Sequence, residues 1–296
     1  MVASKTEGRR AVLFAELSLL LTAFFFGTNF VAVKYAVGPV PPLLFAAVRF
    51  TVAGLLLWLV LRLFEPQSRL SRAEMLPMFG LGIVGITVTQ SVFTVGVSLT
   101  TAANTALVYS TSPIWGLLLG SLIGLERPRL RGVVGVALAL TGVGFIVYGG
   151  LGLGEANLVG DFLILGAAVC WGSYTMLSLS FLERVSPLAV ATYPMLLGGL
   201  AIFPFALFDL RVDTGSLSGA VWFAVLYSTV CSSAFGFAAW QKGVSRVGAN
   251  RVLVYQYLVT LTGVSAGVVI LGESFGYEKV LGAVILLVGV YLARRG

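Results

Sequence analysis

The sequence contains no histidine and only two cysteines, and charged residues make up only 10% of its 296 positions. Without histidine, a transition-metal site would need a cluster of carboxylates, and the sequence has none. It also shows no nucleophile with an accompanying base and no pair of carboxylates, which are the usual marks of a catalytic centre. We therefore expect no metal, no cofactor and no enzymatic activity, and we expect Cys170 and Cys231 to be buried thiols.

Charge is missing altogether from long stretches of the chain. Mean hydropathy is +0.99 and 58% of the residues are hydrophobic. Uncharged runs of about 20 residues are long enough to cross the hydrocarbon core of a bilayer as helices. They are also too long, and too free of alternation, for membrane strands. The sequence therefore predicts an all-α polytopic membrane protein. The uncharged runs cover residues 75–125, 132–154, 162–182, 185–208, 214–241 and 252–272.

Ten transmembrane helices are predicted from these runs and the charged or glycine- and proline-rich segments between them. The expected spans are 12–37, 42–64, 75–98, 103–125, 130–149, 158–183, 187–208, 217–242, 248–271 and 277–293.

The second half of the chain repeats the plan of the first. Ala103-Asn104 reappears as Ala249-Asn250, which is informative because the chain has only four asparagines. Self-similarity at a nearly fixed displacement is the sequence signature of an internal repeat. We predict a first five-helix repeat at 12–149 and a second at 158–294, with a cytoplasmic N-terminus at 1–11 and a linker at 150–157. Further matches, displaced by 145 to 147 positions, are Phe26-Gly27 with Trp171-Gly172, Pro42-Leu43 with Pro187-Leu188, Gly54 with Gly199, Val108-Tyr109 with Val254-Tyr255, Gly116 with Gly263, Gly120 with Gly267, Glu126 with Glu273, Gly135 with Gly282 and Gly142 with Gly289.

Basic residues set the expected orientation. Of the 19 lysines and arginines, all but Lys34, Arg49, Arg211 and Lys279 fall at one face if both termini are cytoplasmic. The hairpin at 98–104 is uncharged, whereas its counterpart at 244–251 carries two arginines. An odd number of spans per repeat reverses the second copy, and positive charge marks cytoplasmic loops. The sequence thus predicts inverted-topology repeats in the inner membrane. The net charge of +7 reflects this placement rather than a nucleic-acid partner.

These paired motifs resemble the two EamA units of the drug/metabolite transporter superfamily. The features that carry the resemblance are the aromatic-Gly pair in the first span of each repeat, the span entered through Pro-Leu, and Glu126 or Glu273 followed by glycines nine and sixteen positions later. Within the superfamily the chain is most similar to the YddG-type aromatic amino-acid exporters. The resemblance implies export and a central cavity walled mainly by the first, third and fourth spans of each repeat, with the fifth at the periphery.

Polar and aromatic side chains on single helical faces are the candidates for such a cavity, because polar groups in a membrane turn toward the bundle interior. Such a lining suits an amino acid or a related amphipathic solute. Hydroxyl groups could instead hydrogen-bond between helices. The candidates are Thr22, Phe26, Asn29, Thr87, Gln90, Tyr109, Trp171, Tyr174, Ser228, Ser232, Gln256 and Thr260.

Four glycines and one proline are candidates for packing or hinge positions. Small residues let helices approach closely, and a proline inside a span removes a backbone hydrogen bond and kinks or opens the helix. The residues are Pro113, Gly116, Gly120, Gly263 and Gly267.

Two basic residues fall within spans. Arg49 lies about seven residues into the second span, where it could pair structurally, reach the interface or contact a solute carboxylate. Lys34 lies near a span end and can extend to the interface. We expect transport of amino acids by alternating access. The alternatives are an anionic metabolite held by Arg49 and Lys34, or a membrane scaffold or enzyme without transport.

Overall fold

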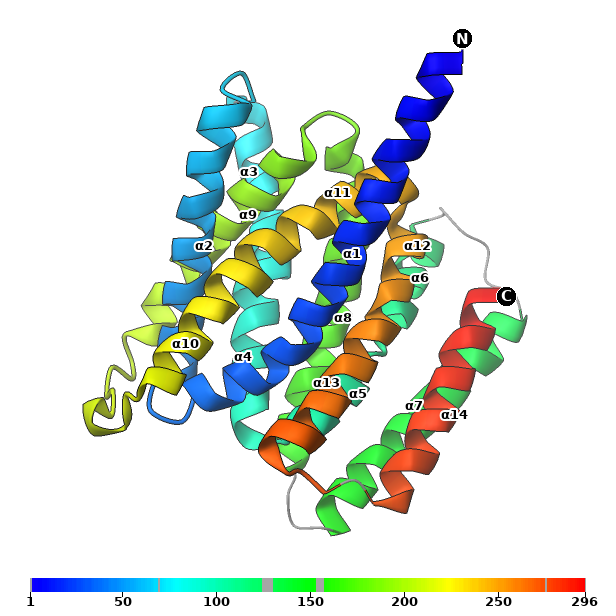
Figure 1. Ribbon diagram of the computed structural model, residues 1–296. Helices are drawn as coiled ribbons and strands as arrows, with labels where there is room; N and C mark the ends of the chain where they lie inside the picture. The colour runs from blue at the N-terminus through cyan, green and yellow to red at the C-terminus, as the bar shows by residue number, and fades with distance from the viewer. Residues whose placement is uncertain (1, 69, 124–129, 153–156, 275, 296) are drawn as a thin grey trace.

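The computed structural model describes residues 2–295 apart from 69, 124–129, 153–156 and 275. It does not describe the side chains of 2–13, 131–133, 149–152 and 293–295. The described chain folds into helices joined by short connections, and no strand occurs in it (Figure 1).

Helices in the first half follow the expected spans. The predicted fourth span is interrupted: α5 ends at Tyr109, Ser110 and Thr111 form a turn, and α6 begins at Ser112. The segments are α1 (Val2–Ala36), α2 (Pro42–Phe64), α3 (Arg72–Gly82), η1 (Ile83–Val88), α4 (Thr89–Leu99), α5 (Ala102–Tyr109), α6 (Ser112–Leu122) and α7 (Leu130–Gly152).

The second half repeats this order. Its ninth predicted span is also irregular near the start, where a short 3₁₀ turn at Leu253–Tyr255 precedes the long helix. The segments are α8 (Leu158–Leu182), α9 (Pro187–Ala206), η2 (Thr214–Ser216), α10 (Gly219–Tyr227), η3 (Ser228–Gly236), α11 (Phe237–Val247), α12 (Ala249–Val252), η4 (Leu253–Tyr255), α13 (Gln256–Leu271) and α14 (Tyr277–Arg295).

Helix starts are fixed by side chains that satisfy the free N–H groups of the first turn. Thr101 accepts a hydrogen bond of 3.0 Å from the N–H of Asn104 at the start of α5. Ser186 does the same for α9, whose first residue is proline. At the start of α3, Ser71 and Glu74 form a reciprocal capping box. These local signals explain why several expected span boundaries fall within a few residues of the observed ones.

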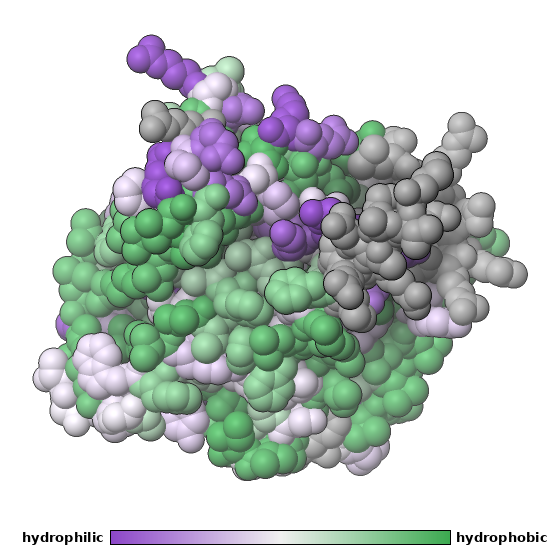
Figure 2. Space-filling view, turned by 45° about the horizontal axis from the view of Figure 1, so that its top comes forward, coloured by the Kyte–Doolittle hydropathy of each residue, from purple (hydrophilic) through white to green (hydrophobic). Residues whose placement is uncertain are grey.

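Seven helical stretches are long and apolar enough, by length and composition, to cross a membrane in the described part of the chain. Their outward faces carry exposed large hydrophobic residues such as Trp222, Phe223 and Val269. On the face seen in Figure 2, apolar residues cover most of the lower part and hydrophilic ones gather toward the top. The chain is therefore a multi-pass integral membrane protein. Ten crossings stay a prediction.

Two predicted connections lie wholly or partly outside the described residues. The basic turn following α6 includes 126–129, and the predicted linker 150–157 includes 153–156. The start of that linker is helical, since α7 continues to Gly152.

Two π-helical segments interrupt helices at matching places. The displacement of 145 that relates Gly54 to Gly199 also carries Ile83, the first residue of η1, to Ser228, the first residue of η3. A π-helical turn inserts an extra residue and changes which face the following side chains occupy; such turns are rare and concentrate at functional sites. Each repeat therefore carries this irregularity in its third helical stretch, which consists of α3, η1 and α4 in the first half and of α10, η3 and α11 in the second.

Helices α7 and α14 pack against each other at one side of the bundle (Figure 1). Their backbones approach closely at Gly142, where a Cβ would lie 2.5 Å from the backbone nitrogen of Leu286. The start of α1 and the end of α14 point toward the same end of the molecule in Figure 1.

Candidate functional site

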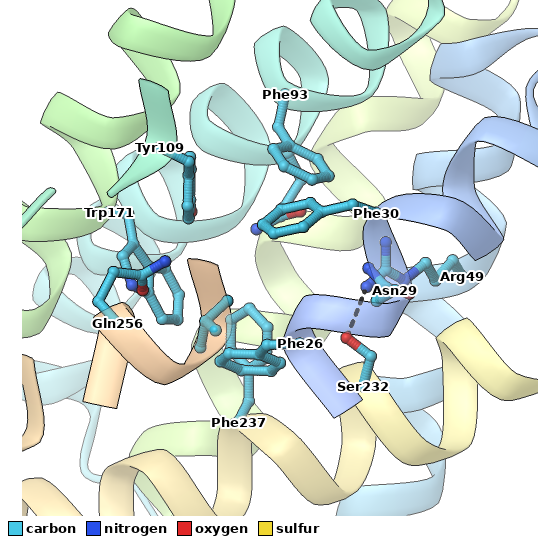
Figure 3. A pocket seen from close by; sticks show the side chains of 12 residues that line it. Phe26, Asn29, Phe30, Arg49, Phe93, Tyr109, Trp171, Ser232, Phe237 and Gln256 are labelled. Atoms are coloured by element: carbon cyan, nitrogen blue, oxygen red, sulfur yellow. Dashed lines mark hydrogen bonds between the residues drawn. The ribbon is translucent and has the colours of Figure 1, made fainter. Parts of the chain in front are cut away.

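A small cavity lies at the centre of the bundle, between helices of both halves (Figure 3). Its volume is about 40 Å³, which holds water but lies well below the roughly 300–1,000 Å³ of typical ligand pockets. As it stands, the cavity is too small for a ligand of that size. The lining residues are Phe26, Asn29 and Phe30 of α1, Arg49 of α2, Gln90 and Phe93 of α4, Tyr109 of α5, Trp171 of α8, Ser232 of η3, Phe237 of α11, and Gln256 and Val259 of α13.

One part of the wall is a cluster of large rings. Trp171 is its centre, with ring centroids 5.1 Å from Phe237, 5.4 Å from Trp240 and 5.9 Å from Phe26. Most of these pairs are tilted or edge-to-face, the arrangement that the charge distribution of aromatic rings favours. The cluster joins α1, α8 and α11 across the two halves of the chain.

A second ring cluster closes the cavity on the side of α4 and α5. Phe93 lies 5.4 Å from Tyr109 and 5.8 Å from Phe30, measured between ring centroids. These three residues come from three helices of the first half. The cavity is thus enclosed by rings on two sides.

Arg49 supplies the charge in the wall. The side chain is 2% exposed. Its Nε donates to Ser233 Oγ at 2.7 Å and to the carbonyl of Ser228 at 3.2 Å, and its Nη2 donates to Ser232 Oγ at 3.3 Å. The guanidinium carbon also lies 4.7 Å from the ring centroid of Phe50, a cation–π contact. Arg49 therefore ties α2 of the first repeat to η3 of the second.

Hydrogen bonds through Ser228 of η3 connect Asn29 to this arginine. The hydroxyl of Ser228 donates to Asn29 Oδ1 at 2.7 Å, while the Ser228 carbonyl accepts from Arg49. All three groups are buried. This network fixes the position of Asn29 at the cavity edge.

Other buried polar groups in the wall have no hydrogen-bond partner among the described residues. They are both amide atoms of Gln256, Nε1 of Trp171 and Nη1 of Arg49. Such groups are costly to bury alone, so each one leaves an unused donor or acceptor at the cavity.

Seven of the twelve predicted cavity residues, together with Arg49, line the cavity. They are Phe26, Asn29, Gln90, Tyr109, Trp171, Ser232 and Gln256. That they contact a solute stays a prediction.

The other five predicted residues lie outside the cavity wall. Thr22 bonds the carbonyl of Ser18 and Thr260 those of Gln256 and Ala106, as hydroxyls in apolar helices commonly do. Thr87 bonds the carbonyl of Gly198 at 2.9 Å and lines a groove beside α9. The last two stand behind the wall: Ser228 supports Asn29, and Tyr174 packs against Trp171 with ring centroids 5.5 Å apart.

The sequence analysis missed four residues in the wall: Phe30, Phe93, Phe237 and Val259. Apolar residues in an apolar helix carry no polarity signal that separates the cavity from the lipid. A spacing of four from Phe26 to Phe30 was the available sign for one of them, because residues four apart share a helix face.

The candidate packing residues lie at close helix contacts. Gly116 and Gly120 face α8 beside Met176, and a Cβ at Gly263 would lie 2.5 Å from the ring of Phe30. A Cβ at Gly267 would lie 2.7 Å from the carboxylate of Glu273. Pro113 stands in the first turn of α6, directly after the interruption at Ser110 and Thr111. It needs no N–H there, which explains how the helix resumes at that point.

Lys34 lies away from the cavity. Its ammonium donates to the carbonyls of Val97, Ser98 and Thr100 at 2.9, 3.3 and 2.6 Å, at the end of α4. The structure thus separates the two basic residues that the anionic-metabolite hypothesis had placed together. Arg49 is in the wall and Lys34 holds a hairpin.

A bundle of apolar helices around a cavity lined by rings and polar groups occurs in membrane transport proteins. The particular family follows from sequence comparison: the chain belongs to the EamA-like transporter family, which matches it twice, over residues 13–148 and 158–295. It therefore contains two EamA repeats of the drug/metabolite transporter superfamily.

Relatives cover nearly the whole chain. An uncharacterized transporter of Archaeoglobus fulgidus is 28% identical over 94% of this chain and 97% of its own length. A probable amino-acid metabolite efflux pump of Salmonella typhimurium is 24% identical over 92% of each chain. One crystal structure matches with a TM-score of 0.65 over 96% of both chains, and at 22% identity it shows the fold alone. The relatives' names support a transport role rather than an enzymatic one.

Proposed function

We propose that this EamA transporter is a secondary transporter that exports amino acids, aromatic or other apolar ones foremost, and related amphipathic metabolites. The observation that supports this most is the composition of the cavity wall. It combines large rings, amides and one guanidinium group around a single cavity. The efflux-pump name of the Salmonella typhimurium relative points the same way.

The wall suits the three parts of an aromatic amino acid. Rings of Phe26, Trp171 and Phe237 can pack against an apolar side chain. The amides of Gln90 and Gln256 offer carbonyl oxygens to an ammonium group, and Arg49 offers N–H donors to a carboxylate. A YddG-type preference for aromatic amino acids is part of this proposal.

Alternating access is the mechanism that we propose. The volume of about 40 Å³ is too small for an amino acid, so binding requires the two halves to separate. We propose ten crossings arranged as inverted repeats of residues 12–149 and 158–294, with both termini in the cytoplasm and the protein in the inner membrane. In transporters of this kind the solute site lies near the bilayer midplane, where the repeats meet.

Counterflow in proteoliposomes tests the function. Purified protein is reconstituted with internal unlabelled amino acid, and uptake of labelled L-phenylalanine, L-leucine, L-lysine and L-glutamate is followed against protein-free liposomes. We expect uptake of L-phenylalanine and L-leucine well above the protein-free control, with little uptake of L-lysine. Uptake equal to that control for the whole panel would contradict the proposal.

The second candidate function is transport of an anionic metabolite, and Arg49 in the wall favours it. In this case Arg49→Ala abolishes uptake of anions and leaves neutral solutes unaffected. Preferred uptake of L-glutamate over L-phenylalanine in the same panel would select this candidate over the first.

A further inference from the structure

Arg49 is buried, and no carboxylate of the described residues lies within 4 Å of its guanidinium nitrogens. The ion pair found in the described part of the chain joins Arg211 and Asp209 at the surface. Removing a guanidinium from water is costly unless an anion or a full set of acceptors compensates it. Here the acceptors are hydroxyls and one carbonyl, all from η3.

The hydrogen bonds at Nε of the guanidinium are stronger than those at its Nη1–Nη2 edge. Nε makes the short bond of 2.7 Å to Ser233. At the other edge Nη2 makes only the long bond of 3.3 Å to Ser232, drawn in Figure 3, and Nη1 has no partner among the described residues. The Nη1–Nη2 edge is the one that binds both oxygens of a carboxylate end-on.

The opposite side of the cavity has matching groups. The Gln256 amide and the Trp171 Nε1 are buried and unpartnered among the residues described. Figure 3 shows both residues across Phe26 and Phe30 from Arg49. A carboxylate satisfies the Arg49 side, whereas the Gln256 amide and the Trp171 N–H need a polar group of the ligand.

The link from Arg49 to η3 has no counterpart in the other repeat. The displacement of 145 carries Arg49 to Pro194 of α9, which has no donor side chain. There the π-helical segment is held by the neutral hydroxyl of Thr87, which donates to the Gly198 carbonyl, and by close backbone packing: a Cβ at Gly82, directly before η1, would lie 2.7 Å from the carbonyl of Pro194. Only the η3 contact depends on a charged side chain that also reaches the cavity.

We propose that the carboxylate of a solute binds the Nη1–Nη2 edge of Arg49. It replaces the Ser232 hydroxyl as the acceptor of Nη2 and so removes one of the hydrogen bonds between Arg49 and η3. Occupancy of the cavity is thereby linked to the conformation of the third helical stretch of the second repeat. A π-helical segment suits this role, because removing its extra residue from the turn shifts the register of the helix that follows. The proposal rests on transport through this cavity and specifies the group of the solute that is recognised.

Binding of four matched probes tests the recognition step. They are L-phenylalanine, L-phenylalaninamide, 3-phenylpropionate and phenethylamine, which share a ring and differ in carboxylate and amine. We expect the purified protein to bind the two carboxylates at least about tenfold more tightly than their uncharged or cationic counterparts, as a charge-assisted pair predicts. Arg49→Gln should remove this difference.

A thiol in η3 reports the conformational step. Cys231 lies within η3 and both cysteines are free, so Cys170→Ser leaves one site for a spin label. We expect L-phenylalanine, but not L-phenylalaninamide, to change the mobility of the label, and Arg49→Gln to abolish the change. Ser232→Ala, which removes only the acceptor of Nη2, should keep the carboxylate preference and reduce the ligand-induced change.

The outcomes separate this proposal from the proposed function. Binding of 3-phenylpropionate but not L-phenylalanine would support the carboxylate site and contradict amino-acid transport. Equal binding of carboxylates and amides by the folded parent protein would overturn the carboxylate site while leaving transport intact. An unchanged carboxylate preference in Arg49→Gln would overturn it as well.

Discussion

The carboxylate of Glu273 accepts a hydrogen bond of 2.6 Å from the N–H of Ala102, the first residue of α5. Its other oxygen accepts one of 2.8 Å from the N–H of Ala103. A carboxylate at a helix N-terminus satisfies free N–H groups and interacts favourably with the helix dipole. Glu273 lies between α13 and α14, so it ties the end of the second repeat to the first.

The hairpin between α4 and α5, which includes Ala102 and Ala103, is held by two further contacts. Lys34 of α1 donates to carbonyls at the end of α4, and Thr100 donates to Asp161 of α8 at 2.7 Å. Opposite charges thus hold opposite helix ends, a cation at the C-terminus of α4 and an anion at the N-terminus of α5. The 97–103 hairpin closes the bundle at the end opposite the start of α1 (Figure 1).

Glu273→Gln should loosen this hairpin. The amide keeps one acceptor but loses the charge that strengthens both bonds. We expect hydrogen–deuterium exchange in a peptide covering 99–106 to rise about tenfold, as loss of a charge-assisted bond predicts. Glu183→Gln, at an exposed carboxylate, is the control. Equal exchange in the parent and in Glu273→Gln would show that the bonds do not hold the hairpin.

Lys34→Met should lower thermal stability. The substitution keeps the length of the side chain and removes three hydrogen bonds to backbone carbonyls. Bonds from a charged donor contribute about 2 kcal/mol, so the melting temperature in detergent should fall by about 5 °C. Lys242→Met, at an exposed lysine, should leave it within about 1 °C. A melting temperature for Lys34→Met that matches this control would refute the role given to Lys34.

Two glycines of α8 give a matched pair for helix packing. A Cβ at Gly172 would overlap the carbonyl of Ser112 and lie 2.7 Å from the backbone nitrogen of Gly116, whereas nothing lies within 4 Å of one at Gly166. We expect Gly172→Ala to destabilise the protein by about 1–3 kcal/mol through overpacking. Gly166→Ala should be neutral or stabilising by up to about 1 kcal/mol. Equal stability of the two variants, measured by thermal unfolding, would contradict the close contact of α6 and α8.

Topology has its own test. If each repeat crosses the membrane five times, the second is inverted and both chain ends lie in the cytoplasm. Reporter proteins fused separately to each end, one fluorescent only in the cytoplasm and one active only outside it, should both report the cytoplasm. Ends on opposite sides would rule out the inverted-repeat arrangement.

Much of the fold can be predicted from the chain because its signals are local. Long uncharged runs mark the helices, and Ser186-Pro187 or Thr101 mark helix starts through capping. Pro113 marks the interruption between α5 and α6. The π-helical segments have no comparable sign, since Ile83–Val88 reads as ordinary apolar helix.

The cavity residues are harder to predict, because the π-helical segments that orient them have no local sign in the sequence. Thr87 and Gln90 are three positions apart and share a face in a regular α-helix. The π-helical segment η1 ends just after Thr87, and its wider turn rotates Thr87 toward α9 while Gln90 reaches the cavity. Which apolar ring faces inward, as Phe93 does, depends on the packing of helices distant in sequence and leaves no mark in the local pattern.

Counterflow of L-phenylalanine in Trp171→Ala tests the central claim most directly, with Trp222→Ala as the matched control. Trp171 is 2% exposed at the centre of the cavity rings, whereas Trp222 is 61% exposed on the outer surface of α10. We predict that Trp171→Ala lowers the initial rate about tenfold, because a ring–ring contact with the solute contributes up to about 1.5 kcal/mol, while Trp222→Ala keeps the parent rate. If both folded variants exchange L-phenylalanine as fast as the parent, the cavity between the two repeats is not the transport site.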